Sequence, residues 1–370
     1  MSPSIAEHFS SLKDHRIERH KKHELIDVLV LCVSAVISGA EGWKDIVDFG
    51  NTKLDWLRQF VPLENGIPVD DTVARIISGL SVKGFQDCFQ SWIQSVAEIT
   101  DGECIAIDGK TLRRSHDKKS GKKALHMISA WASENEMVLG QVKTEEKSNE
   151  ITAIPELLKI LELKGCIITI DAMGCQETIV KDIVAGKGDY AIAVKGNQGH
   201  LHDSIIDYFT IAEENGFKNT PIQFKETLDK GHGRVEIRRY WISNYLDSIH
   251  NTKRWKNLSA VGMVESERYD NGKTSIDKRY YILSFYDVDL FAKAVRSHWG
   301  IENKLHWTLD MTFREDESRI RRENGSHNFG VIRHMALNLL KSENTKRSIK
   351  GKRLRSALDD KFRAKVLCGE

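Results

Sequence analysis

The stretches CIAIDGKT, residues 104–111, and GCIITIDAM, residues 165–173, decide the fold of this 370-residue chain. Each is a short apolar run that reads as a buried strand, and each ends at an aspartate, Asp108 or Asp171. A small residue follows each aspartate and leaves room for a ligand. Because functional residues of open α/β sheets gather at the carboxyl ends of strands, both aspartates are candidate site residues.

Around these two runs, strand-like and helix-like segments alternate. Two further strands, joined by a turn at 134–136, lie between them, and a helix is predicted over 150–163. A helix over 176–188 and a strand over 189–198 follow the second run. The order β-β-β-α-β-α-β predicts an α/β unit with a mixed sheet.

The segments on either side have other periodicities. Residues 1–98 carry apolar residues at three- and four-residue steps, which predicts a small all-α unit. Residues 222–285 read as four strands, a β-rich segment placed inside the α/β unit. Helical periodicity returns over 290–310 and 331–342, and we expect the basic tail from 343 onward to be peripheral.

The composition, with 40% hydrophobic and 29% charged residues, is that of a soluble globular protein. The six cysteines show no C-x-x-C spacing, which indicates reduced thiols. The polar N-terminus carries no secretory signal. The longest apolar run, 25–40, contains Asp27 and falls short of the roughly 20 apolar residues of a membrane span. These features predict a cytoplasmic protein with no membrane partner.

The net charge of +2 does not by itself indicate a nucleic-acid partner. A phosphate-binding surface needs local basic patches, which a whole-chain total can hide. Each patch would equally suit a solvated charged face. Basic residues cluster at 13–23, 110–123, 314–322 and 346–365.

The two aspartates alone do not make a site, since a lone aspartate at a strand end often caps a turn or a helix. Two of them on neighbouring strands repel unless a cation lies between them. Oxygen ligands of this kind suit Mg²⁺ or Mn²⁺. A third carboxylate is needed to hold two ions. Three candidates compete near the helix 290–310: Glu302, Asp310 and the pair Glu315 and Asp316.

A zinc site is the alternative on the same helix. His298, Glu302 and His306 lie four residues apart on one helical face, a spacing that can bind zinc. The sequence supplies no convincing further ligand for it.

Several long strings occur along the chain in a fixed order. The N-terminal part contains KHELIDVLVLCVSAVISGAEGWKDIVDFG, KLDWLRQF and NGIPVDDT. The later part contains IAIDGKTLRRS, IITIDAMGCQ, DYAIAVKGNQ, GHGRVEIRR, RSHWGIENKLHWTLDMTFREDESR and RHMALNLLK. Together they cover nearly the whole chain and resemble the H-repeat-associated transposases of bacterial insertion sequences, a branch of the DDE transposases.

The resemblance implies an RNase H-like mixed-sheet catalytic core with an inserted β-rich segment, preceded by a small all-α domain. The implied divisions are a helical transposase-associated domain at 1–98, a DDE catalytic domain at 99–342 with the insertion at about 200–286, and a basic tail at 343–370. The family's metal-binding catalytic acids fall on Asp108, Asp171 and Glu302. They would hold two Mg²⁺ (or Mn²⁺) ions.

The implied activity is DNA transposition. Hydrolysis of a phosphodiester at the end of the element would be followed by attack of the freed 3′-hydroxyl on target DNA, in an in-line displacement assisted by two metal ions. The implied partners are double-stranded DNA, as terminal inverted repeats and target, and a second copy of the chain in a synaptic homodimer. The implied place of action is the nucleoid of a bacterial cytoplasm.

The chain departs from the broader group around the catalytic glutamate. That group has Tyr and Arg seven and four residues before the glutamate and a basic residue seven after it, where this chain has Val295, His298 and Leu309. His298, Arg296 or Lys304 would replace the missing contacts. The residues predicted to contact DNA are Lys110, Arg113, Arg114, Lys195, Asn197, Arg296, His298 and Lys304.

Three questions stay open at the level of sequence. A metal-dependent nuclease without strand transfer would have the same site, and an inactive DNA-binding relic would keep the same fold. The string GHGRVEIRR puts Arg234, Glu236 and Arg238 on one strand face, which suits either DNA contact or an internal ion-pair ladder. Trp299 and Trp307, which flank Glu302, suit either base stacking or core packing.

Overall fold

A nine-stranded mixed sheet runs through the molecule. The computed structural model describes residues 5–97, 101–116, 124–144, 150–218, 220–231, 234–270 and 273–369. Strands β1 to β3 are antiparallel neighbours, and β4 and β5 run parallel to β1. The predicted α/β unit with a mixed sheet is confirmed. Its elements are β1 (Cys104–Leu112), β2 (Leu125–Ala132), β3 (Met137–Thr144), α7 (Glu150–Lys159), β4 (Ile167–Ile170), α8 (Glu177–Ala185) and β5 (Asp189–Val194).

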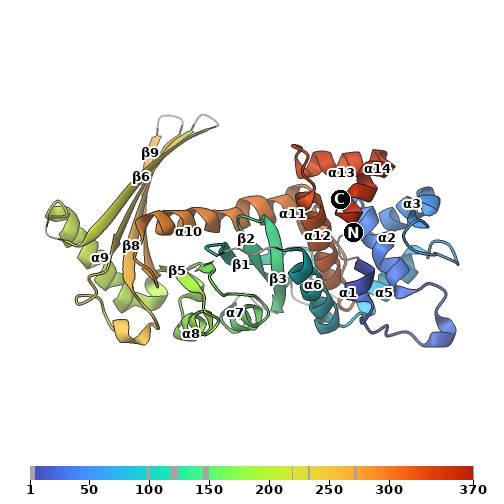
Figure 1. The fold of residues 1–370 in the computed structure, drawn as a ribbon, viewed down its shortest axis with the longest axis horizontal. Helices are drawn as coiled ribbons and strands as arrows, with labels where there is room; N and C mark the ends of the chain where they lie inside the picture. Colours follow the sequence, from blue (N-terminus) through green and yellow to red (C-terminus); the bar gives the residue numbers. More distant parts are fainter. Residues whose placement is uncertain are drawn as a thin grey trace.

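The β-rich segment continues this sheet, so its strands are not a separate layer. Strand β9 pairs with β5, from Ala191 opposite Leu283 to Val194 opposite Tyr280. The strand order is therefore β3-β2-β1-β4-β5-β9-β8-β7-β6. The four strands rise beyond the rest of the sheet and are called the arm below (Figure 1). They are β6 (Ile222–Gly231), β7 (Arg234–Ser243), β8 (Ala260–Asp270) and β9 (Lys273–Leu283).

Helices cover both faces of the sheet. Helix α10 (Val288–Gly300) lies along one face, and α7 and α8 lie along the other (Figure 1). Helix α9 (Gly199–Glu214) packs against β9 of the arm. Because the central strands are covered on both sides, every residue of β2 is buried.

Helices are the only regular elements among the described residues 5–97. Nearly every residue of α2 is buried, and α2 ends just before Gly39, whose φ of +112° L side chains rarely adopt. Asp27 is tolerated in this helix because its carboxylate accepts the backbone N–H of Leu63 at 3.0 Å. None of the described helices has the length and apolar content needed to cross a membrane. The helices are α1 (Ile5–Phe9), α2 (Leu25–Ile37), α3 (Trp43–Thr52), α4 (Leu54–Leu57), α5 (Asp70–Gly79) and α6 (Val82–Val96).

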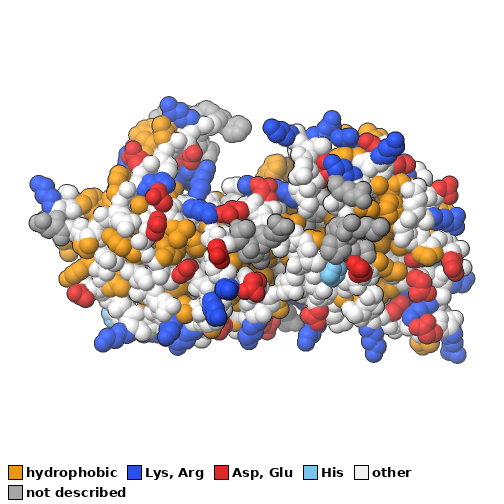
Figure 2. Space-filling view, in the orientation of Figure 1, with side chains coloured by type: hydrophobic (Ala, Val, Ile, Leu, Met, Phe, Trp, Pro, Cys, Tyr) orange, Lys and Arg blue, Asp and Glu red, His pale blue; other side chains and the backbone are white. Residues whose placement is uncertain are grey.

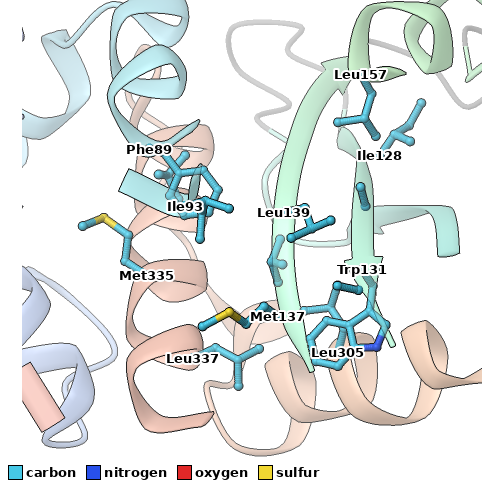
Figure 3. Close-up of a cluster of buried hydrophobic side chains, with 14 of the residues drawn as sticks. Phe89, Ile93, Ile128, Trp131, Met137, Leu139, Leu157, Leu305, Met335 and Leu337 are labelled. Carbon is cyan, nitrogen blue, oxygen red and sulfur yellow. The ribbon is translucent and has the colours of Figure 1, made fainter. Parts of the chain in front are cut away.

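A continuous apolar core joins these helices to the sheet. Phe89 and Ile93 of α6 lie beside Met335 and Leu337 of α12 (Gly325–Ser342), and this group faces Met137 and other residues of β3 (Figure 3). Helix α12 also packs against α2 and α5, and all of its residues as far as Leu340 are buried. The helical part and the sheet therefore share one core.

The C-terminal segment is not peripheral, which corrects the expectation from its basic composition. It forms α13 (Ile349–Leu358) and α14 (Asp360–Cys368), which pack on α2. Arg353 donates to the carbonyls of Val36 at 3.1 Å and Ala40 at 3.2 Å, and Arg363 is fully buried over the Trp56 ring. Basic side chains can be buried here because backbone carbonyls and aromatic rings satisfy them.

Candidate active site

Parallel pairing brings the two predicted aspartates together on adjacent strands. Strands β1 and β4 pair with Ile107 opposite Ile170, so the next residues, Asp108 and Asp171, lie side by side. Asp171 directly follows β4 as expected, but β1 continues past Asp108 to Leu112, because β2 stays paired with it, so Asp108 does not end its strand. The Asp171 carboxylate is exposed and accepts the backbone N–H of Met173 at 3.0 Å, which caps a short turn. Asp171 thus caps a turn and also lies beside Asp108 of the neighbouring strand.

Glu302 reaches the same place from a long helical run. The predicted helix 290–310 is confirmed as α10, a π-helical turn over Ile301–His306, and α11 (Trp307–Met311). The Glu302 side chain is 54% exposed, whereas that of Asp108 is 16% exposed. One carboxylate at the surface and one beneath it give a site that a ligand can reach from one side.

His306 completes a compact group with two of the acids. Its Nδ1 lies 3.6 Å from an Asp108 oxygen and 3.5 Å from a Glu302 oxygen. One ligand atom from each of the three residues lies within 4.8 Å of the others. Asp171 is not a member of this group of three, although its charge acts on Asp108.

The two neighbouring carboxylates of the site differ in pKa. Burial and the neighbouring Glu302 carboxylate raise the pKa of Asp108 to about 8. The His306 imidazole lowers the pKa of Glu302 to about 2. Two adjacent carboxylates cannot both ionise without cost, so a divalent cation between them would be favourable.

The other acids that competed with Glu302 have a different partner. Asp310 and Glu315 both contact the ammonium of Lys110, Glu315 at 2.9 Å. Arg333 of α12 lies 3.6 Å from the other oxygen of Glu315, and these buried charges tie β1 to α11 and α12. Lys110 was predicted to contact DNA, but its side chain is 11% exposed and enclosed by carboxylates. The position of Lys110 therefore favours an internal role.

Other predicted DNA contacts lie at or near the surface. Arg113 is 82% exposed and lies 3.2 Å from Asp316, and both Arg114 and Lys195 are exposed. Asn197 donates to the carbonyl of Ala172 at 2.6 Å, so it supports the turn that follows Asp171.

The predicted contacts on the helical run have partners of their own. Arg296 lies 3.2 Å from Asp229, Lys304 pairs with Glu136, and His298 contacts the Thr169 hydroxyl at 3.0 Å through Nδ1. Arg296 and Lys304 line one depression of about 280 Å³ together with Trp299 and Asn303. A role in DNA contact stays a prediction for these residues.

The charged strand β7 forms an internal ladder in its described part. Arg238 pairs with Asp229 and Glu236, and Arg239 contacts Glu226 and Glu265 at 2.8 Å. The side chain of Arg234 lies outside the described residues. The sequence left two interpretations of this strand, DNA contact and an ion-pair ladder, and the ion-pair ladder is confirmed for Glu236 and Arg238.

The two tryptophans beside Glu302 differ. Trp299 is half-buried under the guanidinium of Arg279, 5.0 Å from its ring centroid. Trp307 is 59% exposed, so the prediction that it packs in the core is wrong. His306 was weighed in the sequence only as part of a zinc site with His298, yet the structure groups it with Asp108. Its spacing of four residues from Glu302 was the available signal.

Two family models match the chain. A model described as "Transposase DDE domain" matches residues 99–339. The chain belongs to this transposase family. A model described as "DDE_Tnp_1-associated" matches residues 6–93. The resemblance expected from the sequence strings is confirmed.

Individual relatives agree with this family. The chain is 44% identical, over 99% of its length and 98% of the relative, to "H repeat-associated putative transposase YhhI" of Escherichia coli (strain K12). It is 54% identical, over 20% of its length and 88% of the relative, to "Inactive transposase YbfQ" of the same organism. Among solved structures, a cryo-EM structure of the piggyBac transposase synaptic complex with hairpin DNA matches with a TM-score of 0.44 and 11% identity, over 95% of this chain and 75% of that one.

Proposed function

We propose that this protein is a DNA transposase that cleaves the ends of an insertion element with divalent metal ions and transfers the 3′ ends to target DNA. The observation that carries the proposal is the proximity of acids that are far apart in the sequence. Asp108 and Asp171 lie side by side on adjacent strands, and Glu302 of the helical run lies close to Asp108. Their proposed role is to bind metal ions.

The proposed catalytic core is RNase H-like. The order β3-β2-β1-β4-β5, with three antiparallel strands followed by two parallel ones, supports this proposal. We assign the helical domain to 1–98, the catalytic domain to 99–342 and the C-terminal helices to 343–370. The arm occupies most of the proposed insertion at about 200–286.

The residues fit Mg²⁺ or Mn²⁺. Asp108 and Glu302 offer oxygen ligands close together, and the raised pKa of Asp108, caused by burial and the Glu302 carboxylate, marks a place where positive charge is favourable. Two bound ions would neutralise charge on the scissile phosphate and on the attacking and leaving oxygens. Within the chain, Asn197 supports the turn beside Asp171, and Lys110 ties β1 to α11. These contacts keep the acids in position.

Double-stranded DNA is the proposed substrate, as terminal inverted repeats and as target. A hollow lies between the arm and the C-terminal helices, and α10 and α11 run along its floor (Figures 1 and 2). Exposed Arg113, Arg114 and Lys195, together with Arg296 and Lys304, would contact phosphates near the site. We further propose a homodimer in the synaptic complex and action at the bacterial nucleoid.

An assay with labelled terminal repeats and a target plasmid tests this function. With Mg²⁺ or Mn²⁺, joined product between the labelled end and the plasmid is expected. Cleavage without joined product would show a nuclease instead. Neither reaction, from a protein that is folded and binds the repeats, would show an inactive relic, as the name of one relative, "Inactive transposase YbfQ", describes that protein.

A further inference from the structure

His306 lies behind the carboxylates in a position that the three-acid site does not explain. Its side chain is 7% exposed, and its Nδ1 lies 3.6 Å from Asp108 and 3.5 Å from Glu302. We infer that His306 is a direct ligand, through Nδ1, of a divalent cation held by Asp108 and Glu302. The inference rests on the proposed function and adds a nitrogen ligand to its site.

The spacing of the three groups suits an ion between them better than direct contact. Both Nδ1 distances exceed the 2.7–3.2 Å that is usual for an N–H···O hydrogen bond. Ligand atoms bound at about 2.0–2.3 Å to one ion lie roughly 3–3.5 Å apart. The observed separations therefore already approach those of a ligand shell.

The second ring nitrogen gives independent support. Nε2 of His306 is buried and has no hydrogen-bond partner among the described residues. His306 lines a cavity of about 10 Å³, and buried nitrogens of Gln141 and His334, two other lining residues, also lack described partners. A cavity of that size holds about one water molecule when polar groups surround it. A metal-ligating histidine normally donates its other N–H to such a partner, which fixes the tautomer.

The walls of this cavity are themselves held in place. Lys110 and Glu315, which form the ion pair between β1 and the segment after α11, line it together with His306. The helix is π-wound over Ile301–His306, a rare geometry that recurs at functional sites. An ordinary core histidine would need neither the π turn nor a polar cavity behind it.

A nitrogen ligand changes the metal preference of the site. Mg²⁺ prefers oxygen ligands, whereas Mn²⁺ accepts an imidazole nitrogen more readily. Replacing His306 with Asn puts an amide near the place of Nδ1 and keeps the side chain polar. We expect His306→Asn to weaken Mn²⁺ binding by about tenfold or more, on the scale of losses seen when metal-site partners are removed. Mg²⁺ binding should weaken less.

The experiment uses the full chain without DNA, loaded with Mn²⁺. Calorimetry measures binding, and pulsed electron paramagnetic resonance detects coupling between Mn²⁺ and a directly bound ¹⁴N nucleus. The wild type should show this coupling, and His306→Asn should lose it while still binding Mn²⁺. His298→Gln is the matched control, because His298 lies one turn before Glu302 but contacts Thr169. The control should keep the coupling.

Each other outcome has a distinct meaning. Mn²⁺ binding without ¹⁴N coupling in the wild type overturns the inference and leaves the proposed function standing. Loss of the coupling in His298→Gln alone overturns it in favour of the other histidine. Absence of any Mn²⁺ binding counts against the metal site itself. If circular dichroism shows that His306→Asn does not fold, the electron paramagnetic resonance spectra of the wild type and of His298→Gln still test the inference.

Discussion

Asp171 takes part in two interactions that one substitution can separate. Its carboxylate oxygen accepts the Met173 N–H, and its charge reaches Asp108 on the next strand. An asparagine oxygen can accept the same N–H, so Asp171→Asn should keep the turn and lose only the charge. The two effects of this residue, local structure and proposed chemistry, can therefore be measured apart.

Asp171→Asn is expected to reduce cleavage of terminal-repeat DNA by at least about a thousandfold, because metal assistance contributes several kcal/mol and each 1.4 kcal/mol is tenfold. Binding to the same DNA should change by less than about threefold. Gel assays with labelled DNA measure both quantities. Asp203→Asn, at a 71% exposed carboxylate on α9, is the matched control and should cleave normally. Cleavage by Asp171→Asn at the wild-type rate would refute the site assignment.

Glu315 shows why a third acid could not be chosen from residue type. Its side chain is 4% exposed and faces Lys110 and Arg333, whereas Glu302 is open to ligands. Glu315→Gln would leave two buried cations short of a partner, which costs roughly 3–5 kcal/mol of unfolding free energy. Denaturant unfolding measures this loss. Glu317→Gln, at a 52% exposed residue paired with Arg314, should cost less than about 1 kcal/mol.

The same glutamate predicts a pH dependence of stability. Burial raises its pKa, but Lys110 and Arg333 outweigh burial and bring it to about 2. The folded pKa of Glu315 lies below the ordinary value of 4.5. At pH values between these two, the folded state therefore binds fewer protons than the unfolded state. The stabilisation is therefore complete above about pH 4.5 and is lost as pH falls toward 2. Thermal unfolding of Glu315→Gln should lack this component, and equal acid sensitivity in both proteins would contradict the prediction.

At the scale of elements, alternation and helical periodicity identified the segments but not their partners. The apolar runs ending at Asp108 and Asp171 predicted two buried strands, and both are strands. The pairing of β9 with β5 could not be predicted, because the alternation of apolar and polar residues in a strand indicates its buried face but not its neighbouring strand. The π turn at Ile301–His306 was equally hidden, because the apolar spacing of the helix 290–310 continues through it.

The C-terminal helices show that a basic composition does not determine exposure. Arg353 on α13 was expected in a peripheral tail, yet it donates to carbonyls at the end of α2 and lies 4.4 Å from the Phe313 ring centroid. Those carbonyls become available only when α2 and α13 meet. No local sequence pattern indicates this contact between α2 and α13, which explains why the C-terminal segment was wrongly expected to be peripheral.

Arg353→Ala should lower the free energy of unfolding by about 2–4 kcal/mol, because several buried carbonyls lose a charged donor and a cavity remains. Chemical denaturation followed by circular dichroism measures the change. Lys350→Ala, at an exposed position of the same helix, should change stability by less than about 0.5 kcal/mol. Equal effects of the two substitutions would mean that α13 is not docked as described.

At the scale of the whole molecule, the sheet brings the arm, the acid site and the helical part into one elongated body. The hollow of Figure 2 is bounded by the arm and the C-terminal helices, and the helix that carries Glu302 runs beneath it (Figure 1). The net charge of +2 is too small to attract DNA from every side. Binding must then depend on local basic groups near the site.

Arg113 and Arg114 provide the sharpest test of this local binding. Both are exposed just after the strand that carries Asp108, whereas nearby Lys110 is enclosed by carboxylates. Each phosphate contact contributes about 0.9 to the slope of log affinity against log salt on duplex DNA. Replacing both arginines with alanine should weaken binding to terminal-repeat DNA and make the slope shallower by about 1.8.

Fluorescence anisotropy across a salt series measures the slope. Lys181→Ala is the matched control, because Lys181 is 61% exposed on α8, which lies on the sheet face opposite α10 (Figure 1). The control should keep the wild-type affinity and slope. If the double variant also keeps the wild-type slope, the arginines do not contact phosphate and the DNA path avoids the end of β1. If Lys181→Ala changes the slope by as much, binding is diffuse and the hollow is not the preferred surface.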